Sequence, residues 1–274
     1  MLRPFRFKRF SVSHQRSAMK VGTDGVLLGA WCGVRATDRY ALDIGTGTGL
    51  IALMLAQRGE SNPLFIDAVE IDPASADEAE ENAVASPWAD RINVMRCSLQ
   101  EFVSGDSLFP DRQQVTSGQS PAISTVIADE YRTHRPVTSR LYDLIVSNPP
   151  FFSGSLHSPD VARTMARHSV SLSYEELVGA AARLLSDDGR FCVIVPYEHH
   201  ADFLSLSIGY GFSAERITSV IPKPGALPKR SLLQLSKGDI RSVSHRDELL
   251  IELGGRHEYS REYKMLTSDF YLKF

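Results

Sequence analysis

Three alternating glycines stand in the segment Ala41-Leu42-Asp43-Ile44-Gly45-Thr46-Gly47-Thr48-Gly49-Leu50. An apolar run over residues 40–44 precedes them and is typical of a buried strand, and an apolar run over residues 48–58 predicts a helix. Glycine has no Cβ, so it permits a tight turn and lets a ligand lie against the main chain. Free N–H groups at the start of the helix attract anionic groups. The segment therefore predicts a strand–turn–helix unit that binds a cofactor.

The glycine spacing indicates which cofactor. Dinucleotide-binding loops have the pattern Gly-x-Gly-x-x-Gly. Here Leu50 stands where the third glycine would be, and Gly49 falls one place early. The resulting Gly-x-Gly-x-Gly, preceded by Asp43, resembles the first motif of class I S-adenosylmethionine-dependent methyltransferases. That resemblance implies that Gly45, Gly47 and Gly49 pass under the ribose and methionine of the cofactor. It also implies that Asp43 lies near the methionine ammonium.

An acid closes the next predicted strand, at residues 65–71. The end of this strand reads Val69-Glu70-Ile71-Asp72. An acid at this position of a doubly wound sheet accepts hydrogen bonds from ribose hydroxyls, so we predict that Glu70 contacts the cofactor ribose, with Ile71 beside it. Asp72 precedes Pro73 and is instead predicted to cap the following helix.

Strands and helices alternate along most of the chain. We expect strands at residues 40–44, 65–71, 91–96, 141–147, 190–195, 214–221 and 231–236, with another near 249–253, and helices between most of them. This alternation predicts an α/β fold of βαβ units on a parallel sheet. The resemblance of the glycine loop implies that this fold is a Rossmann-like class I methyltransferase with a seven-stranded, mostly parallel sheet and helices on both faces. We expect a basic N-terminal arm and helix at residues 1–36, a methyltransferase domain at 37–240 and a small C-terminal extension at 241–274.

Residues 104–139 interrupt this alternation. They lack a sustained period and are rich in Ser, Thr, Gln, Pro and Arg. Long segments of this kind are usually functional or disordered. Two interpretations stay open, a flexible surface insertion and a flap that contacts RNA beside the active site.

Composition restricts the class of protein. The chain has 274 residues, of which 43% are hydrophobic and 23% charged, and its net charge is −3. This balance is that of a globular protein with a sizeable core and excludes a surface coated in positive charge, although a local basic face is still possible. Cys32, Cys97 and Cys192 are too far apart for a metal site or a disulfide framework. The apolar runs are too short to cross a membrane, and no apolar region follows the basic N-terminus. We expect a cytoplasmic protein without a bound metal.

The predicted strand at 141–147 ends in Asn148-Pro149-Pro150-Phe151. Ligands of parallel sheets bind at the carboxyl ends of the strands, so this tetrapeptide and the glycine loop share one edge. The lone pair of an exocyclic adenine nitrogen is delocalised into the ring. Two acceptors, the Asn148 side-chain oxygen and the Pro149 carbonyl, would aim it at the methyl group. Pro149 and Pro150 fix the backbone, and Phe151 offers a face on which a base can stack. We predict that all four residues are catalytic and that Asn148 also contacts the cofactor.

These motifs extend to a resemblance over nearly the whole chain outside residues 104–139. The resembling segments are Phe5 to Trp31 with Met19-Lys20-Val21-Gly22-Thr23-Asp24-Gly25, Ser86-Pro87-Trp88-Ala89-Asp90-Arg91, Leu227-Pro228-Lys229-Arg230, Tyr259-Ser260 and Phe270-Tyr271-Leu272. Together they resemble the bacterial tRNA(Val) adenine-N6 methyltransferases, which modify adenine-37 beside the anticodon. The resemblance implies S-adenosyl-L-methionine as cofactor and the tRNA anticodon loop as partner, with no obligatory protein partner.

The same resemblance implies two further cofactor contacts. Thr23 would line the methionine end. Such enzymes often place an acid after the third strand, where it reads the adenine of the cofactor, but this chain has Ser98 there. Ser98, Glu101 or the backbone around Leu99 could replace that acid.

Basic residues alternate with Phe at the N-terminus. The combination suits phosphate contact and base stacking, so we predict an RNA-binding surface formed by six cations. These are Arg3, Arg6, Lys8, Arg9, Lys229 and Arg230. The alternative is an arm whose Phe side chains pack on the core.

Other functions remain open at this stage. The same tetrapeptide chemistry serves N5-glutamine methylation of a protein such as a release factor, and guanine-N2 methylation of rRNA is a third possibility. A non-catalytic RNA-binding module is disfavoured by the intact Asp43, Gly45 and Asn148, and a nicotinamide oxidoreductase by Leu50.

Overall fold

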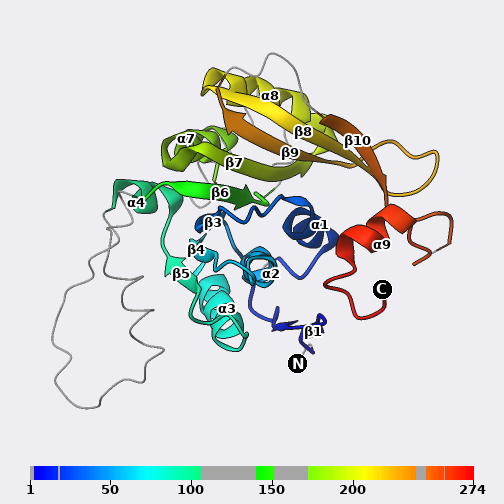
Figure 1. Cartoon of the computed structure of the whole chain (residues 1–274), viewed down its shortest axis with the longest axis horizontal. Helices are drawn as coiled ribbons and strands as arrows, with labels where there is room; N and C mark the ends of the chain where they lie inside the picture. The colour runs from blue at the N-terminus through cyan, green and yellow to red at the C-terminus, as the bar shows by residue number, and fades with distance from the viewer. Residues whose placement is uncertain (1–2, 18, 106–139, 151–171, 239–244, 256) are drawn as a thin grey trace.

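The computed structural model describes residues 3–17, 19–105, 140–150, 172–238, 245–255 and 257–274. Eight strands of these residues form one sheet in the order β10-β8-β9-β7-β6-β3-β4-β5 (Figure 1). The strands are β3 (Tyr40–Ile44), β4 (Phe65–Glu70), β5 (Ile92–Arg96), β6 (Tyr142–Ser147), β7 (Leu185–Pro196), β8 (Phe212–Ile221), β9 (Arg230–Lys237) and β10 (His245–Leu250). β9 runs antiparallel to β7 and β8, and the other pairs are parallel.

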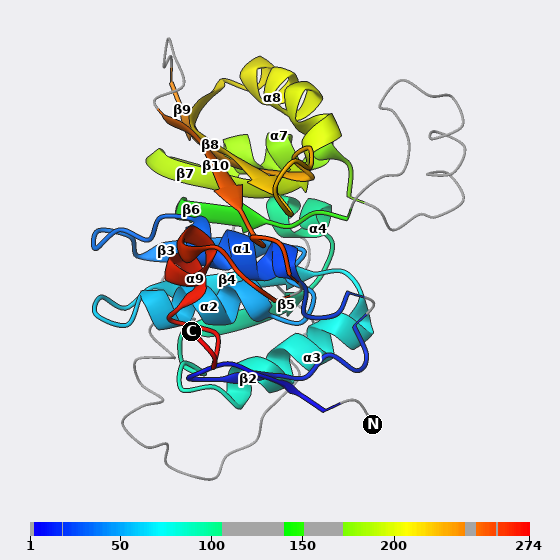
Figure 2. The same cartoon turned by 90° about the vertical axis from the view of Figure 1, so that its right-hand side faces the viewer.

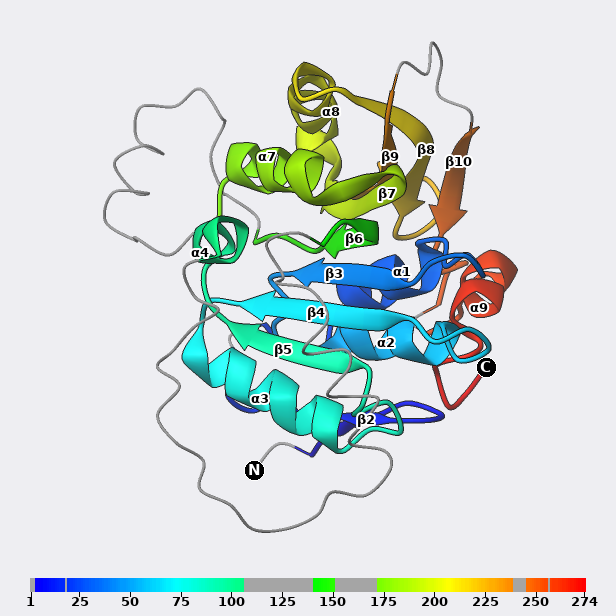
Figure 3. The same cartoon turned by 60° about the vertical axis from the view of Figure 1, so that its left-hand side comes forward.

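Helices cover both faces of the sheet (Figure 2). One face carries α1 (Thr23–Trp31), α2 (Leu50–Arg58) and α9 (Arg261–Thr267), and the other carries α4 (Leu99–Ser104), α7 (Tyr174–Leu184) and α8 (His200–Gly209). α3 (Pro73–Val84) lies along β4 and β5 (Figure 3), and a short 3-10 helix, Tyr197–His199, follows β7. The predicted Rossmann-like architecture is confirmed.

The central strands are buried on both faces. On β7, Cys192 and Ile194 face the core beneath α1 and α2, while Phe191, Val193 and Val195 face the core beneath α7 and α8. All five side chains are fully buried. Continuous apolar runs of this kind are characteristic of parallel strands covered on both sides, which explains why their positions are readable in the sequence.

The sheet has one strand more than the seven predicted. β10 begins at His245, four residues before the strand expected near 249–253, and pairs in parallel with β8. Polar contacts hold it in place: Asp247 accepts hydrogen bonds from the Thr218 hydroxyl and from Arg216 Nη2, the latter at 3.2 Å. Because these contacts do not follow an apolar period, the hydrophobic pattern did not mark the start of the strand.

The N-terminal arm packs its aromatic rings into the core. After the short hairpin of β1 (Phe5–Arg6) and β2 (Ser11–Val12), the rings of Phe7 and Phe10 stack with centroids 4.6 Å apart. Phe7 also stacks on Tyr271 near the C-terminus. Phe7 and Phe10 are buried, so neither ring is available for a base.

Two further observations concern the described part of the chain. None of its helices is long and apolar enough to cross a membrane. Its His, Cys, Asp and Glu side chains form no group of three that could hold a metal ion.

Candidate cofactor and active site

The three predicted site segments leave the sheet side by side. In the register of the sheet, Ile44 at the end of β3 stands opposite Val69 on β4 and Ser147 on β6. The next residues along the chain are Gly45, Glu70 and Asn148. The fold therefore brings the glycine loop, the ribose-binding candidate and the tetrapeptide to one carboxyl edge, where parallel sheets bind ligands.

The glycine loop needs its glycines. Gly45, Gly47 and Gly49 have φ of 70°, 57° and 78°, a left-handed region that disfavours other residues. The loop is held against β4 because Gly45 N and Thr46 N both donate to the Val69 oxygen, at 2.9 and 3.0 Å. A Cβ added at Gly45 would meet no atom of the described residues within 4 Å, so the main chain faces open space there.

Asp43 lies fully buried beneath this loop. Its Oδ2 accepts hydrogen bonds from Thr46 Oγ1 at 2.6 Å and from Ala52 N at 3.2 Å. Its Oδ1 has no hydrogen-bond partner among the described residues. Burial raises the pKa of Asp43 to about 7, although the hydrogen bond from Thr46 opposes the rise. A buried oxygen without a partner is costly, which fits the expected proximity of a cationic ligand group.

Glu70 contacts the glycine loop directly. Its Oε2 accepts from Gly47 N and its Oε1 from Asp72 N, each at 2.9 Å. Asp72 caps α3, as predicted, by accepting from Ser75 N at 2.8 Å. Beside Glu70, the Ile71 side chain is 42% exposed, an unusual position for an isoleucine and one available to a ligand.

Ser98 and Glu101 form a capping box at the start of α4. The Ser98 hydroxyl accepts from Glu101 N at 3.1 Å, while Glu101 Oε2 accepts from both Ser98 N and Ser98 Oγ at 2.8 Å. Each side chain satisfies the other. The three alternatives for reading the cofactor adenine, Ser98, Glu101 and the backbone at Leu99, all stay predictions. The Ser-x-x-Glu spacing is a signature of this cap that the sequence already contains.

Asn148 carries the most informative polar atom of the edge. Its side-chain oxygen is buried and has no hydrogen-bond partner among the described residues. Pro149 is buried and Pro150 exposed. An unsatisfied buried amide oxygen costs about 1–3 kcal/mol and calls for an explanation, which a donor on a bound substrate would supply. Phe151 lies outside the described residues.

Thr23 and Arg230 meet at the same edge. Thr23 is the first residue of α1, and its neighbour Asp24 accepts a 2.8 Å hydrogen bond from Arg230 Nε. Arg230 begins β9 and stands opposite Pro196 at the end of β7. Arg230 is therefore tied to α1, whereas the preceding Lys229 is exposed.

The arm cations lie elsewhere. Arg9 forms an ion pair with Glu60 and lies over the Trp88 ring at 5.5 Å. Glu60 precedes β4 and Trp88 precedes β5, so this pair is at the opposite edge of the sheet from Asn148. Lys8 Nζ donates to the main-chain oxygens of Ser268 and Phe274, each at 2.6 Å. Arg3 and Arg6 are exposed. The structure thus separates the arm from Lys229 and Arg230, and the RNA role of all six stays a prediction.

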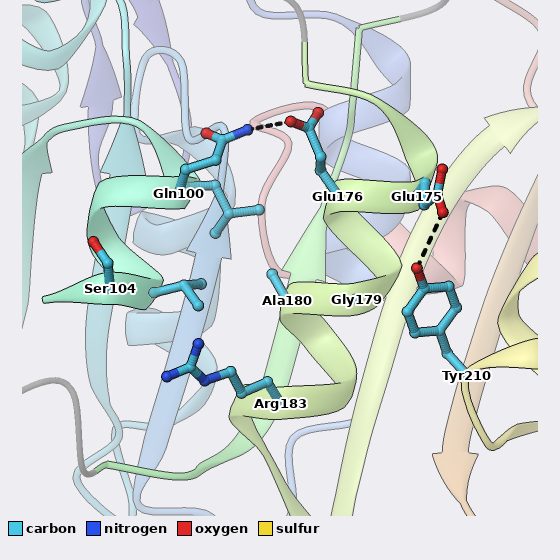
Figure 4. Close-up of a pocket in the computed structure, with 10 residues that line it drawn as sticks. Gln100, Ser104, Glu175, Glu176, Gly179, Ala180, Arg183 and Tyr210 are labelled. Carbon is cyan, nitrogen blue, oxygen red and sulfur yellow. Dashed lines mark hydrogen bonds between the residues drawn. The ribbon is translucent and has the colours of Figure 1, made fainter.

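A groove of about 500 Å³ lies on the outer surface between α4 and α7 (Figure 4). Gln100 bonds Glu176 across it at 2.5 Å, and the Tyr210 hydroxyl reaches Glu175 at 3.3 Å. Its lining includes Leu99 but not Asp43, Glu70 or Asn148, so it is not the predicted cofactor site.

Comparison with known proteins identifies the family. No family model matches the chain. The tRNA1(Val) (adenine(37)-N6)-methyltransferase of Bacteroides thetaiotaomicron is 42% identical over 268 residues, covering 98% of this chain and 97% of that protein. Proteins of the same name from Flavobacterium johnsoniae and Trichodesmium erythraeum are 41% and 40% identical; the matches cover 98% of this chain in both cases, and 98% or more of each protein. The chain belongs to the tRNA1(Val) (adenine(37)-N6)-methyltransferase family.

Solved structures agree on the fold of this family member. An O-methyltransferase from Agrobacterium tumefaciens superposes with a TM-score of 0.60 at 18% identity, covering 90% of this chain and 96% of that one. A transferase from Pyrococcus horikoshii gives 0.52 at 12% identity, covering 86% and 72%. S-adenosyl-L-methionine is the cofactor of the family. The left-handed glycines and the unpartnered oxygens of Asp43 and Asn148 fit such a ligand.

Proposed function

We propose that this protein transfers the methyl group of S-adenosyl-L-methionine to N6 of adenine 37 in tRNA(Val), next to the anticodon, in the cytoplasm. The observation that carries the proposal is the Asn148 side-chain oxygen, buried without a partner among the described residues and beside the glycine loop. Two oxygen acceptors, Asn148 Oδ1 and the Pro149 carbonyl, suit a substrate nitrogen with two N–H groups better than a hydroxyl, which has one O–H, or a carbon.

The chain supplies orientation. Asn148 Oδ1 and the Pro149 carbonyl accept hydrogen bonds from the two N–H groups of N6 and thereby point the nitrogen lone pair at the methyl carbon. The bound cofactor supplies a methyl group made electrophilic by its sulfonium. The methyl group would pass from the sulfur of the bound cofactor to this nitrogen, which would then lose one proton to water. Alignment of this kind can supply much of the rate, since methyl transfer from a sulfonium needs little acid–base help.

We assign the cofactor contacts around the edge described above. Gly45, Gly47 and Gly49 pass beneath the ribose and methionine, Glu70 accepts from the ribose hydroxyls, and Asp43 and Thr23 lie at the methionine end. Ile71 and the backbone at Leu99 flank the adenine. Support comes from the open space at Gly45 and the exposed Ile71 side chain. Glu70 would exchange its bond to Gly47 N for bonds to the ribose.

We further propose that the anticodon loop docks along the strand ends next to Asn148. Lys223 and Lys229 lie on the β8–β9 connection, where Leu227 is 80% exposed, and Tyr197 is 37% exposed after β7. β7 pairs with β6, β9 with β7 and β8 with β9, and the ends concerned lie at the edge that carries Asn148. Two cations, an aromatic ring and an apolar side chain are suited to single-stranded nucleic acid. Arg3 and Arg6 would contact a different part of the RNA.

The test is transfer of a labelled methyl group from S-adenosyl-L-methionine to unmodified tRNA by the purified protein, followed by digestion to nucleosides. Label in N6-methyladenosine from a valine tRNA, lost when adenine 37 is replaced by guanine, is the expected result. The same assay is run in parallel with a release factor and with rRNA, and label in a glutamine or at guanine-N2 with none in tRNA would overturn the proposal in favour of those substrates.

A further inference from the structure

A buried acid on α3 binds the main chain of the N-terminal segment. The Glu78 carboxylate, on a residue only 1% exposed, accepts hydrogen bonds from three consecutive N–H groups. The donors are Gln15 N at 2.6 Å, Arg16 N at 3.2 Å to each oxygen, and Ser17 N at 2.8 Å. Burial alone raises the pKa of Glu78, but these N–H groups outweigh it and hold the pKa below its usual value, so Glu78 is charged at neutral pH.

Asn82, one turn further along α3, continues the anchor. Its Oδ1 accepts from Ser13 N at 2.8 Å, and its Nδ2 donates to the Ser13 oxygen at 2.9 Å. The same Nδ2 donates at 2.9 Å to the main-chain oxygen of Thr48, which lies within the glycine loop. One side chain therefore joins the N-terminal segment to the loop.

The anchored segment lies against the glycine loop. Ser17 is 1% exposed, and its hydroxyl oxygen is 3.9 Å from the place where a Cβ on Gly47 would be. Lys20 Nζ donates to the Ser17 oxygen at 2.8 Å and to the Gln15 oxygen at 3.1 Å. The chain then enters α1 at Thr23, the predicted contact for the methionine end of the cofactor. Figures 1 and 3 show the N-terminal hairpin beside α3.

We propose that Glu78 and Asn82 are positioning residues for the cofactor: they hold residues 13–17 against the glycine loop and so fix one wall of the cofactor site before the cofactor arrives. This inference rests on the cofactor site proposed above. A wall that is already ordered spares the binding step the entropy of ordering it, so the anchor raises affinity without touching the ligand. Loss of the anchor would remove the acceptor of all three N–H groups, of which that of Ser17 is buried, and free the segment.

The alternative is that the anchor only stabilises the protein. In that case its loss would lower the melting temperature and leave cofactor affinity unchanged. Glu81, a nearby acid on α3, provides a matched control because it pairs with the Arg16 side chain at the surface, whereas Glu78 binds the main chain.

The experiment compares Glu78→Ala, Glu78→Gln, Asn82→Ala and Glu81→Ala. For each folded variant, the dissociation constant for S-adenosyl-L-methionine is measured by titration calorimetry, and amide exchange of residues 13–17 by mass spectrometry. We expect Glu78→Ala and Asn82→Ala to weaken binding by ~10- to 100-fold, because each loses at least two hydrogen bonds. Glu78→Gln keeps an acceptor oxygen and should recover part of the loss. Glu81→Ala should bind within about twofold of the wild type.

The outcomes separate the two proposals. Faster exchange at residues 13–17 in folded Glu78→Ala and Asn82→Ala, with cofactor affinity within about twofold of the wild type, would overturn the positioning role alone. If Glu78→Ala does not fold, the same comparison of amide exchange with cofactor affinity is made with Asn82→Ala and with Glu78→Gln, which keeps the shape of the side chain. A wild-type protein that binds no S-adenosyl-L-methionine would overturn the proposed function and this inference with it.

Discussion

The Ser147 hydroxyl donates a 2.9 Å hydrogen bond to the main-chain oxygen of Ile44 and joins β6 to β3 at the last residue of each strand. Both side chains are buried. Gly45 and Asn148 therefore leave the sheet from one fixed point, so the cofactor loop and the tetrapeptide cannot shift independently. Fixed geometry of this kind matters in a reaction that depends on alignment of donor and acceptor.

Replacing Asn148 by Ala should remove one of the two acceptors for the substrate amino group. We expect turnover to fall by roughly two to three orders of magnitude, as for loss of one preorganised polar contact. Cofactor binding, measured by titration, should be kept, with a loss of affinity far smaller than the loss of turnover. Asn62→Ala, in the turn before β4 at the opposite edge, is the control and should retain full activity. Near-normal turnover of Asn148→Ala would refute the acceptor role.

Replacing Gly45 by Ala should distinguish the cost of backbone strain from steric exclusion of the cofactor. The φ of 70° costs an alanine about 1 kcal/mol, but no described atom obstructs the new methyl group. If the cofactor occupies the open space at Gly45, affinity should fall by ~10-fold or more, by steric exclusion. Gly211→Ala carries a similar backbone penalty, with φ of 83° and no described neighbour within 4 Å, in the turn before β8. Equal cofactor affinity in the two variants would place the cofactor away from Gly45.

The buried Asp43 predicts a pH dependence of stability. Burial raises its pKa from 3.8 to about 7. A raised carboxyl pKa means that the folded protein favours the neutral form of Asp43. The contribution of this preference to the free energy of unfolding is fully present below about pH 4 and is lost as pH rises through 7. The side-chain amide of the Asp43→Asn variant is neutral at every pH, so denaturant unfolding between about pH 5 and 8 should show the wild type losing stability relative to the variant. Parallel curves would contradict the raised pKa.

Cofactor affinity should also depend on the ionisation of Asp43, with the opposite change as pH rises. A cationic ammonium near Asp43 favours the ionised carboxylate, so the affinity of the wild type for S-adenosyl-L-methionine should increase as pH rises through about 7. In Asp43→Asn the increase should be absent and the affinity uniformly lower. An unchanged pH profile in the variant would assign the methionine end to other residues.

Local sequence signals accounted for much of the fold. β3 was predicted with the bounds that the structure has, and most other strands within two residues, because buried parallel strands are continuous apolar runs. The cap at Asp72 was equally readable, since one residue and the following turn determine it. β7 and β10 were the exceptions: β7 begins at Leu185 through polar residues that carry no strand period, and β10 begins at His245, four residues before the predicted strand. The boundaries proposed at residues 36 and 240 stay predictions.

Contacts between distant segments were not readable. Nothing in the helix containing Glu78 shows that this acid meets the main chain 61 to 63 residues earlier. Ser98 was matched to a cofactor contact by position, and that role stays a prediction; the structure shows its hydroxyl in a capping box with Glu101. The Phe residues of the arm were consistent with either base stacking or core packing, and burial decided for Phe7 and Phe10. Such choices depend on which surfaces meet, which a local pattern does not encode.

The proposed RNA edge predicts a specific salt dependence. Lys223 and Lys229 lie on the connection between β8 and β9, at the edge of the sheet that carries Asn148. If each neutralises one phosphate, the double variant Lys223→Ala/Lys229→Ala should weaken tRNA binding and reduce the slope of log affinity against log salt by about 1 per lysine. Cofactor affinity should stay the same, because neither lysine is among the predicted cofactor contacts. The control, Lys264→Ala/Lys273→Ala, removes two exposed lysines from the C-terminal segment and should leave the slope unchanged. If instead Arg3→Ala/Arg6→Ala lowers the slope and the Lys223→Ala/Lys229→Ala variant does not, the RNA contact belongs to the arm, and the strand-end edge only holds the target base.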